Sequence, residues 1–320
     1  MAEQVVGRVP TPVPGRPAGP LPKARITYWG RYVSAVVIVA VVAALFIALA
    51  QGQIDYAMVP SMIVEDVMLQ GLANTIVLAV AAQVGAVLLG VVIALMRISK
   101  NPVAQWVAWI YTWLFRGLPV LLQIVLWYNL ALVFPIIRIG IPFTDLNVIN
   151  ESSNVLVTAF TAALLGLGLN ESAYMAEIVR AGLSSVDRGQ TEAAQSIGMP
   201  PLKVLRRIVL PQAMRVIIPP TGNDFINMLK GTSIASVIGF VELIKAANNL
   251  SSHNLAVVET LLAAAFWYMV LVSVASVGQY FLERRYSASD RSVGLPRAQR
   301  TLLRRLGRDL AVPPTVRSAT

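Results

Sequence analysis

The chain has 320 residues, of which 56% are hydrophobic and only 13% charged, and its formal net charge is +10. Soluble globular domains carry about 25% charged residues, so this composition excludes an ordinary soluble enzyme. There is no cysteine and only one histidine, His253, which excludes disulfides and metal centres built from these residues. No stretch has the glycine spacing of a nucleotide-binding loop, so the chain is not expected to hydrolyse ATP by the usual route.

Six segments are long and apolar enough to cross a bilayer as helices. A hydrocarbon core about 30 Å thick requires about 20 apolar residues in a helix. The alternation of period two that a membrane barrel requires is absent, which makes strands an unfavourable interpretation. The segments are residues 33–50, 70–96, 117–137, 152–170, 216–241 and 260–282. The sequence therefore predicts an all-α integral membrane protein with six transmembrane helices.

The first segment has a second interpretation as a signal peptide. It follows a basic stretch and ends in Ala48, Leu49 and Ala50, which resembles a cleavage site. However, the segment is longer than a typical signal-peptide core, and the proline-rich residues 1–32 that precede it fit a disordered extension. A retained helix is therefore favoured, and both interpretations give the other five segments the same orientation.

Basic residues alternate between rich and poor loops along the chain. They are concentrated in the N-terminal segment, in the loop that contains Arg97, Lys100 and Arg116, in residues 180–215 and after the last segment. Because cytoplasmic loops carry the excess of basic residues, both termini are expected in the cytoplasm. Membrane topology thus explains most of the positive charge, and nucleic acid is not an expected partner.

Residues 181–211 connect the fourth and fifth segments and predict two short cytoplasmic helices. The first covers residues 190–197 and ends at Gly198, which is followed closely by two prolines. The second is amphipathic, and Pro211 is expected to close it. Small residues in the first helix, such as Ala193, would let a partner approach closely, so the loop fits a docking element.

Several motifs in this order resemble one family. The run Glu192-Ala193-Ala194, with Gly198 and Leu210-Pro211 at matching distances, resembles the loop signature of permease subunits of ATP-binding-cassette importers. Three further runs resemble the polar amino acid permeases: residues 114–119 (LFRGLP), 173–180 (AYMAEIVR) and 220–233 (PTGNDFINMLKGTS). The resemblance covers roughly residues 68–286, and the first span, residues 136–153 and the basic tail depart from the family pattern.

The resemblance implies a type I importer core of five helices with one additional N-terminal helix. In this family the loop contains a coupling helix that inserts into a groove of an ATPase subunit. The docking residues would be Glu192, Ala193, Ala194, Gly198, Leu210 and Pro211. The expected organisation is a disordered basic cytoplasmic N-terminus (1–32), an extra span (33–51), a permease domain (68–286) containing the loop 181–211, and a basic cytoplasmic tail (287–320).

The resemblance also implies the partners. These are ATPase subunits, an identical or related second permease, an extracytoplasmic solute-binding protein, a polar amino acid and membrane lipid. ATP and Mg would bind to the ATPase, so neither a cofactor nor a catalytic or metal site is expected on this chain. The expected location is the bacterial cell membrane, as a multi-pass protein. A self-contained channel or ion-coupled carrier is the main alternative, and a membrane enzyme is less favoured because no catalytic dyad is visible.

Charged and amide side chains inside the predicted spans are candidates for the substrate pathway, because a charge at the bilayer centre costs about 2.5–3.5 kcal/mol. The candidates are Glu177, Asn223, Asp224, Asn227 and Lys230, with Glu171 as a further acidic residue. Two simpler interpretations stay open. Asp224 and Lys230 could lie near the membrane edges, and Glu177 could pair locally with Arg180.

Three remaining features concern the membrane itself. Pro219 and Pro220 could interrupt the fifth segment. Residues 296–312 alternate leucine and arginine in the pattern of a basic amphipathic helix on anionic lipid. Four tryptophans are typical of the aromatic belt at the membrane edge, namely Trp106, Trp109, Trp113 and Trp127.

Overall fold

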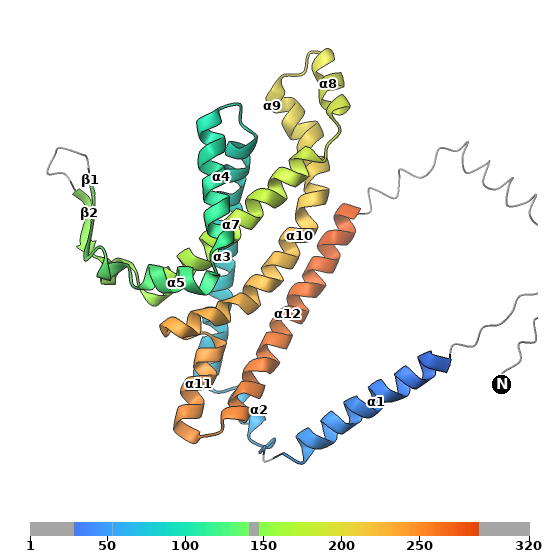
Figure 1. Cartoon of the computed structure of the whole chain (residues 1–320), viewed down its shortest axis with the longest axis vertical. Coiled ribbons are helices and arrows are strands. Elements are labelled where there is room, and N and C mark those ends of the chain that lie inside the picture. Colours follow the sequence, from blue (N-terminus) through green and yellow to red (C-terminus); the bar gives the residue numbers. More distant parts are fainter. Residues whose placement is uncertain (1–28, 53, 141–146, 288–320) are drawn as a thin grey trace, which may run out of the picture. The chain divides into compact units, whose positions relative to one another are not determined.

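The computed structural model describes residues 29–52, 54–140 and 147–287, and helices dominate them (Figure 1). The chain divides into two units, Met1–Ile54 and Asp55–Thr320. In the first unit, α1 (Trp29–Ala50) is a continuous apolar helix at the position of the expected additional N-terminal helix. The extension before residue 29 and the basic segment 296–312 lie outside the described residues.

The second unit consists of long helices joined by short ones and one hairpin. Its elements in chain order are α2 (Val59–Ile63), α3 (Asp66–Ile98), α4 (Pro102–Gly117), α5 (Val120–Tyr128), the 3-10 helix η1 (Leu130–Leu132), β1 (Ile136–Gly140), β2 (Asn147–Ser152), α6 (Ser153–Leu156), α7 (Ala159–Ser184), α8 (Arg188–Ser196), α9 (Pro201–Val204), the π-helix η2 (Leu205–Val209), α10 (Leu210–Gly231), the 3-10 helix η3 (Thr232–Ile238), α11 (Leu243–Asn254) and α12 (Val257–Ser287).

Two of these helices, α3 and α12, are each long and apolar enough to cross a membrane. The number rises to four if each of two bent pairs forms one span: α4 with α5, bent by 99°, and Pro201–Ile238 with α11, bent by 48°. The helical membrane architecture is therefore confirmed, but the described residues do not reach the predicted six spans. One reason is the predicted span 117–137, which breaks at Leu118 because a residue that precedes a proline disfavours the helical conformation.

Several local assignments differ from the prediction. Arg116, assigned from the sequence to a cytoplasmic loop, lies in the last turn of α4. Pro211 does not close the preceding helix: η2 leads directly into α10, and Pro211 lies in the first turn of α10. Pro219 and Pro220 lie inside α10, which continues past them to Gly231 and then as η3 to Ile238.

The expectation of an all-α chain is wrong at residues 136–152. Strands β1 and β2 form an antiparallel hairpin in which Ile137 lies opposite Glu151 and Arg138 lies opposite Asn150. Both strands are rich in β-branched residues, which favour extended backbone. The apolar character of β1 led the sequence analysis to include its start in a predicted span.

Helices α3 and α7 pack closely through small residues. A Cβ atom on Gly90 would lie 2.6 Å from the Cβ of Met175 and 3.0 Å from the carbonyl oxygen of Ser172. The neighbouring contact brings Gly168 close to Ala82. Because lipid provides no hydrophobic drive for helix association, close backbone approach of this kind is a main source of stability in membrane helices.

A buried acidic side chain holds the bend between η3 and α11. Glu242 is fully buried, and its carboxylate accepts hydrogen bonds from the backbone N–H groups of Ile244 (2.9 Å) and Lys245 (2.8 Å) and from the hydroxyl of Tyr268 (2.8 Å). The Leu243 N–H donates to Thr75 Oγ1 at 3.2 Å. These contacts connect α11 to α12 and α3, and they provide the partners that a buried carboxylate requires.

Candidate functional site

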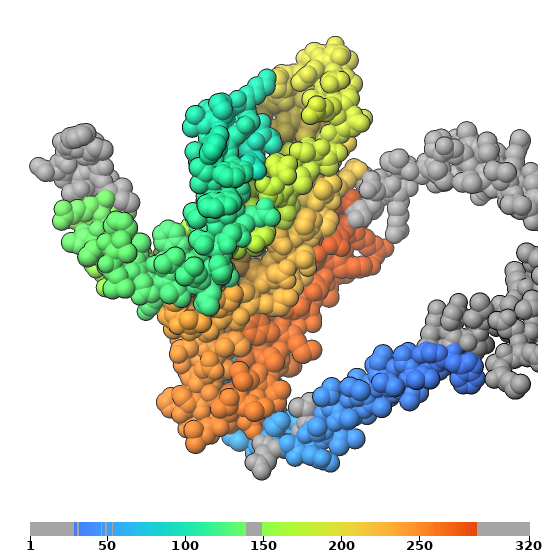
Figure 2. Space-filling view, viewed as in Figure 1, coloured from blue at the N-terminus to red at the C-terminus, as the bar shows by residue number. Residues whose placement is uncertain are grey.

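The predicted docking segment projects from one end of the second unit, opposite the end formed by α2 and α11 (Figures 1 and 2). Asp187 caps the N-terminus of α8, and its Oδ1 accepts the backbone N–H of Gly189 at 2.6 Å. An aspartate at this position satisfies a free N–H group of the first helical turn. The predicted helix at residues 190–197 is thus confirmed to within a few residues.

The end of α8 is a Schellman motif centred on Gly198. Gly198 has φ +79°, which is in the left-handed region. Its N–H donates to the Gln195 carbonyl at 2.9 Å, and the Met199 N–H donates to the Ala194 carbonyl at 3.1 Å. This is the hydrogen-bond pattern that glycine favours at a helix C-terminus, and the predicted helix stop at Gly198 is confirmed.

Two large apolar side chains are exposed on this otherwise polar projection, which suits contact with another protein. Ile197 is 78% exposed and Leu202 76% exposed. We call the exposed residues at this end of the molecule the docking tip: Glu192, Ala193, Ile197, Gly198 and Leu202.

Not every predicted docking residue belongs to this surface. Ala194 is only 3% exposed and is buried, as is Val204 of α9. Leu210 and Pro211 lie at the start of α10, and Leu210 lines an apolar cavity of about 320 Å³. Ile197 was not among the predicted residues, although a large apolar side chain beside a helix-ending glycine could have indicated it.

A polar face on α10 brings together most of the predicted pathway residues. Asn223, Asn227 and Lys230 are exposed and occur at intervals of four and three residues, which places them on one side of the helix. Lys230 lies in the last turn of α10, where the helix dipole favours a cation.

Asp224 lies beside this face and meets an acidic side chain of α7. The carboxyl groups of Asp224 and Glu171 are close enough to interact electrostatically. Glu171 Oε1 is buried with no hydrogen-bond partner among the described residues. We call Glu171, Asn223, Asp224, Asn227 and Lys230 the midspan site.

Polar side chains stabilise the broken end of α4 near this site. Gln123 Nε2 donates to the carbonyl oxygens of Phe115 and Leu118, both at 3.0 Å. Asn170 Nδ2 of α7 donates to the same Phe115 oxygen at 2.6 Å. Irregular backbone within a membrane requires such partners, because lipid supplies none.

Glu177 lies apart from the other predicted pathway residues. Its Oε2 accepts Arg180 Nε and Nη2, each at 2.8 Å, and its Oε1 lies 3.8 Å from Arg97 Nε. The interpretation of Glu177 as the local partner of Arg180 is therefore confirmed. The structure brings Glu171, rather than Glu177, to Asp224.

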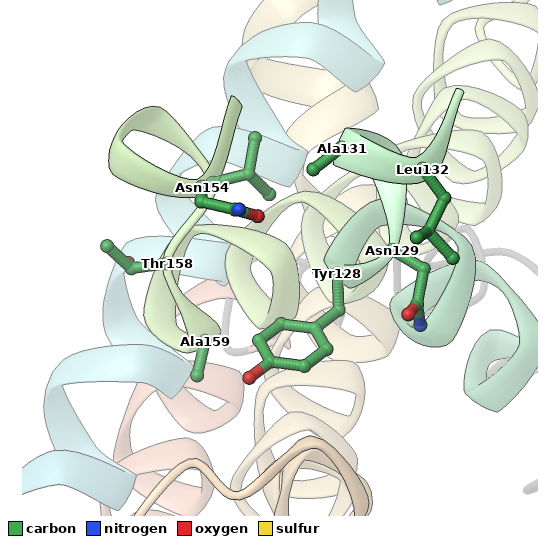
Figure 3. Close-up of a pocket in the computed structure, with 8 residues that line it drawn as sticks. Tyr128, Asn129, Ala131, Leu132, Asn154, Thr158 and Ala159 are labelled. Carbon is green, nitrogen blue, oxygen red and sulfur yellow. The ribbon is translucent and has the colours of Figure 1, made fainter. Parts of the chain in front are cut away.

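A neutral cavity of about 580 Å³ lies where α5, η1, α6 and α7 meet (Figure 3). Asn154, Thr158 and Ala159 lie on one side of it, and Asn129 and Leu132 lie on the other. Its lining offers amide and hydroxyl groups but no charge. Sequence reasoning missed this cavity because its residues come from both sides of the hairpin.

This arrangement of bent membrane helices and a projecting helical loop belongs to a chain whose sequence is similar to known transport proteins. Residues 86–288 match the family described as "Binding-protein-dependent transport system inner membrane component". The chain is 40% identical over 269 residues to an arginine transport system permease protein of Corynebacterium glutamicum, covering 83% of each chain. It is 41% identical over 221 residues to a probable amino-acid permease protein of Bacillus subtilis, covering 69% of this chain and 91% of that protein.

A solved structure has the same arrangement. The chain is similar to one in the "Crystal structure of an amino acid ABC transporter with histidines", with a TM-score of 0.61, 36% sequence identity, and coverage of 73% of this chain and 100% of that chain. The fold and the site therefore define a helical membrane component of a transport system. The chain belongs to the family of inner membrane components of binding-protein-dependent transport systems.

Proposed function

We propose that this chain is the permease subunit of an ATP-binding-cassette importer for polar amino acids, and that cationic amino acids are its preferred class. It forms the pathway through the membrane, while a separate ATPase subunit binds ATP and Mg. The names of the relatives support the amino acid class: arginine for the Corynebacterium glutamicum protein, and glutamine and L-cystine for two from Bacillus subtilis that are 33% and 36% identical.

The docking tip is the observation that carries the proposal. A short capped helix with exposed Ile197 and Leu202 has the shape and chemistry to insert into a groove of another protein. Glu192, Ala193 and Gly198 lie at the centre of this contact, whereas Ala194, Leu210 and Pro211 support it from behind. A self-contained carrier has no use for such a surface.

The position of the tip also suggests how force reaches the pathway. From Pro201 the chain runs through α9, η2 and α10 as one helical stretch that ends at Ile238. Asn223, Asn227 and Lys230 lie on this same stretch. When ATP draws the ATPase subunits together, a docked tip moves with them and re-orients the polar face, which changes the side from which the midspan site is accessible.

The midspan site supports a cationic substrate. The adjacent carboxyl groups of Glu171 and Asp224 suit an ammonium or guanidinium group, and Asn223 and Asn227 offer neutral hydrogen bonds. Lys230 suits the carboxylate end of the same molecule. This assignment includes the predicted residues Asn223, Asp224, Asn227 and Lys230 and adds Glu171.

The remaining partners follow from the family. We propose a second permease copy or relative, an extracytoplasmic solute-binding protein that delivers the amino acid, and surrounding membrane lipid. The basic loops support a bacterial cell-membrane location with both termini in the cytoplasm.

Uptake by reconstituted vesicles tests this function. The chain is reconstituted with its ATPase and with an ATPase variant that binds but does not hydrolyse ATP, and uptake of radiolabelled arginine, glutamine and cystine is measured. We expect ATP-dependent uptake only with the active ATPase, and faster uptake of arginine than of the other two. Uptake that persists without any ATPase and follows an ion gradient would contradict the proposal and favour the ion-coupled carrier.

A further inference from the structure

A groove between α4 and α7 leads away from the midspan site. It has a volume of about 390 Å³, and its lining includes Arg97, Trp109, Trp113, Arg116, Tyr174 and Glu177. Arg97 lies at the end of α3, next to the α3–α4 turn, and Arg116 lies in the last turn of α4. The groove thus extends along the second half of α4 and along the part of α7 that leads to the docking tip.

The exposed surface of α4 is divided into two chemically different flanks. With about 100° of rotation per residue, Val103, Val107, Ile110 and Leu114 form one exposed aliphatic flank. The other exposed flank carries Trp106, Trp109, Trp113, Arg116 and Gln105. Since an aliphatic surface suits lipid tails and a guanidinium does not, the second flank is the one that faces water or a polar ligand.

Arg116 is the unbalanced charge in this groove. Its guanidinium lies 5.1 Å from the centre of the Tyr174 ring, in a cation–π contact. Among the described residues it has no carboxylate partner, because the nearby Glu177 is bound by Arg180 and Arg97. A guanidinium with free donors at membrane depth is suited to bind a carboxylate with two parallel hydrogen bonds.

The groove and the midspan site are neighbours on α7. Asn170, Tyr174 and Glu177 occur at helical intervals on one face of α7, and each contacts the α3–α4 side: Asn170 through Phe115, Tyr174 through Arg116, and Glu177 through Arg97. Glu171, the acidic member of the midspan site, directly follows Asn170. A molecule that leaves the midspan site towards the cytoplasm would therefore meet Arg116 first.

We propose that this groove is a second substrate site, in which Arg116 binds the carboxylate of the amino acid on its way to the cytoplasm. This inference rests on the proposed transport function. Trp109 and Trp113 line the groove together with Arg116. Binding here would hold the amino acid by its α-carboxylate, which all amino acids share. The second site would therefore accept different side chains, and the acidic midspan site would select among them.

An anionic lipid headgroup is the competing occupant, but Arg116 lies too deep in the membrane for a headgroup to reach it easily. Arg116 follows the first residue of α4 by 14 positions, which is about 21 Å along the helix. With the α3–α4 turn at the cytoplasmic surface, as its basic residues predict, Arg116 lies inside a hydrocarbon core about 30 Å thick. A small zwitterion that travels through the protein can reach this depth, whereas a lipid phosphate remains near the membrane surface.

Thiol labelling tests the site directly, because the natural chain contains no cysteine. Gly117 lines the groove beside Arg116, and a Cβ atom there would meet nothing within 4 Å, so Gly117→Cys fits without strain. In vesicles containing the complete transporter, we compare modification by a sulfonate and by a trimethylammonium methanethiosulfonate. Adding Arg116→Gln should lower the sulfonate-to-ammonium rate ratio about fivefold, because it removes the attracting charge.

Protection by ligand identifies what the site binds. L-Arginine should slow the labelling of Gly117→Cys, whereas L-argininamide, which lacks the carboxylate, should not. Gly85→Cys on α3 is the matched control, because its Cβ also meets nothing within 4 Å and it is not among the residues that line the groove. Protection by anionic lipid but not by arginine would overturn the proposal, and so would a Gly117→Cys that does not react with either reagent.

Uptake measurements separate this inference from the proposed function. If both hold, Arg116→Gln lowers ATP-dependent arginine uptake about tenfold, and Arg116→Lys restores part of it, because an ammonium keeps the charge but not the paired hydrogen bonds. If the wild type transports arginine and Arg116→Gln transports it equally well, only the second site is refuted. If the wild-type complex shows no ATP-dependent uptake, the proposed function fails. The second site then fails with it, because an amino acid is no longer the expected ligand of the groove.

Discussion

Gly198 shows how one residue can control the docking tip. Its φ of +79° is a conformation that L side chains rarely adopt, while the space around its Cβ position is empty. The requirement for glycine is therefore conformational and not steric. An alanine in this conformation costs about 1–2 kcal/mol, whereas asparagine tolerates it better than other residues.

We therefore expect Gly198→Ala to weaken binding of the ATPase subunit by about five- to thirtyfold, since 1.4 kcal/mol corresponds to a factor of ten. Gly198→Asn should retain most of the affinity, although its side chain is larger. Titration of labelled ATPase onto the reconstituted chain measures both. Equal losses in the two variants would indicate that the side chain itself is in the way, and the conformational explanation would then be wrong.

At the same scale, single residues are easier to select from the sequence than the residues that they contact. The polar residues Asn223, Asp224, Asn227 and Lys230 stood out because each is costly inside a membrane. Which acid would meet Asp224 was not predictable, since Glu171 and Glu177 lie on one helix and only the packing of α7 against α10 distinguishes them. Arg116 was assigned to a loop because its local sequence does not reveal where α4 begins.

At the scale of elements, the contact between α3 and α7 depends on residues without side chains. Gly90 faces the Cβ of Met175 and the backbone of Ser172 and Ala176, which cannot move aside without shifting the helix. Gly85 is five residues earlier on the same helix and has nothing within 4 Å of its Cβ position. The two glycines therefore provide a matched pair.

Gly90→Ala should lower the free energy of unfolding by about 1–3 kcal/mol, the usual cost of inserting a methylene into a packed interface. Gly85→Ala should have no such cost, and alanine's higher helix propensity favours it slightly. The midpoint of thermal aggregation in detergent, followed by size-exclusion chromatography, compares the variants. A Gly90→Ala protein as stable as the wild type would mean that α3 and α7 separate easily.

The elements that the sequence predicted well are those bounded by strong local signals. Helix α8 was located to within a few residues because Gly198 and the following prolines end it. The bend between α4 and α5 and the start of the hairpin were missed. A uniformly apolar run shows how long a segment is, but it does not show where the backbone changes direction. Leu118-Pro119 marks the bend, but a proline in an apolar run is equally compatible with a kinked continuous span.

At the scale of the whole molecule, the stable core lies within the second unit. The three buried clusters draw on residues between Val59 and Ala275, and among the described residues none of their members belongs to α1. The family match likewise begins at residue 86. The buried clusters of the second unit are thus made without residues of α1.

A truncated chain that begins at Asp55 should therefore insert, assemble with the ATPase and transport the amino acid at a rate within about twofold of the full chain, since its buried contacts are intact. A chain that begins at Gln70 is the control. It also loses Met62 and Met68, which are 4% and 0% exposed in the cluster that joins α2, α3, α11 and α12.

Removal of two buried methionines leaves a cavity that costs several kcal/mol, so the shorter chain should aggregate or fail to assemble. Both chains are expressed with the same tag and compared by membrane yield, by co-purification with the ATPase and by vesicle uptake. If the chain from Asp55 assembles normally but transports nothing, α1 has a role in the transport cycle itself. If it fails to insert, α1 is required for biogenesis, and the buried clusters alone do not define the functional unit.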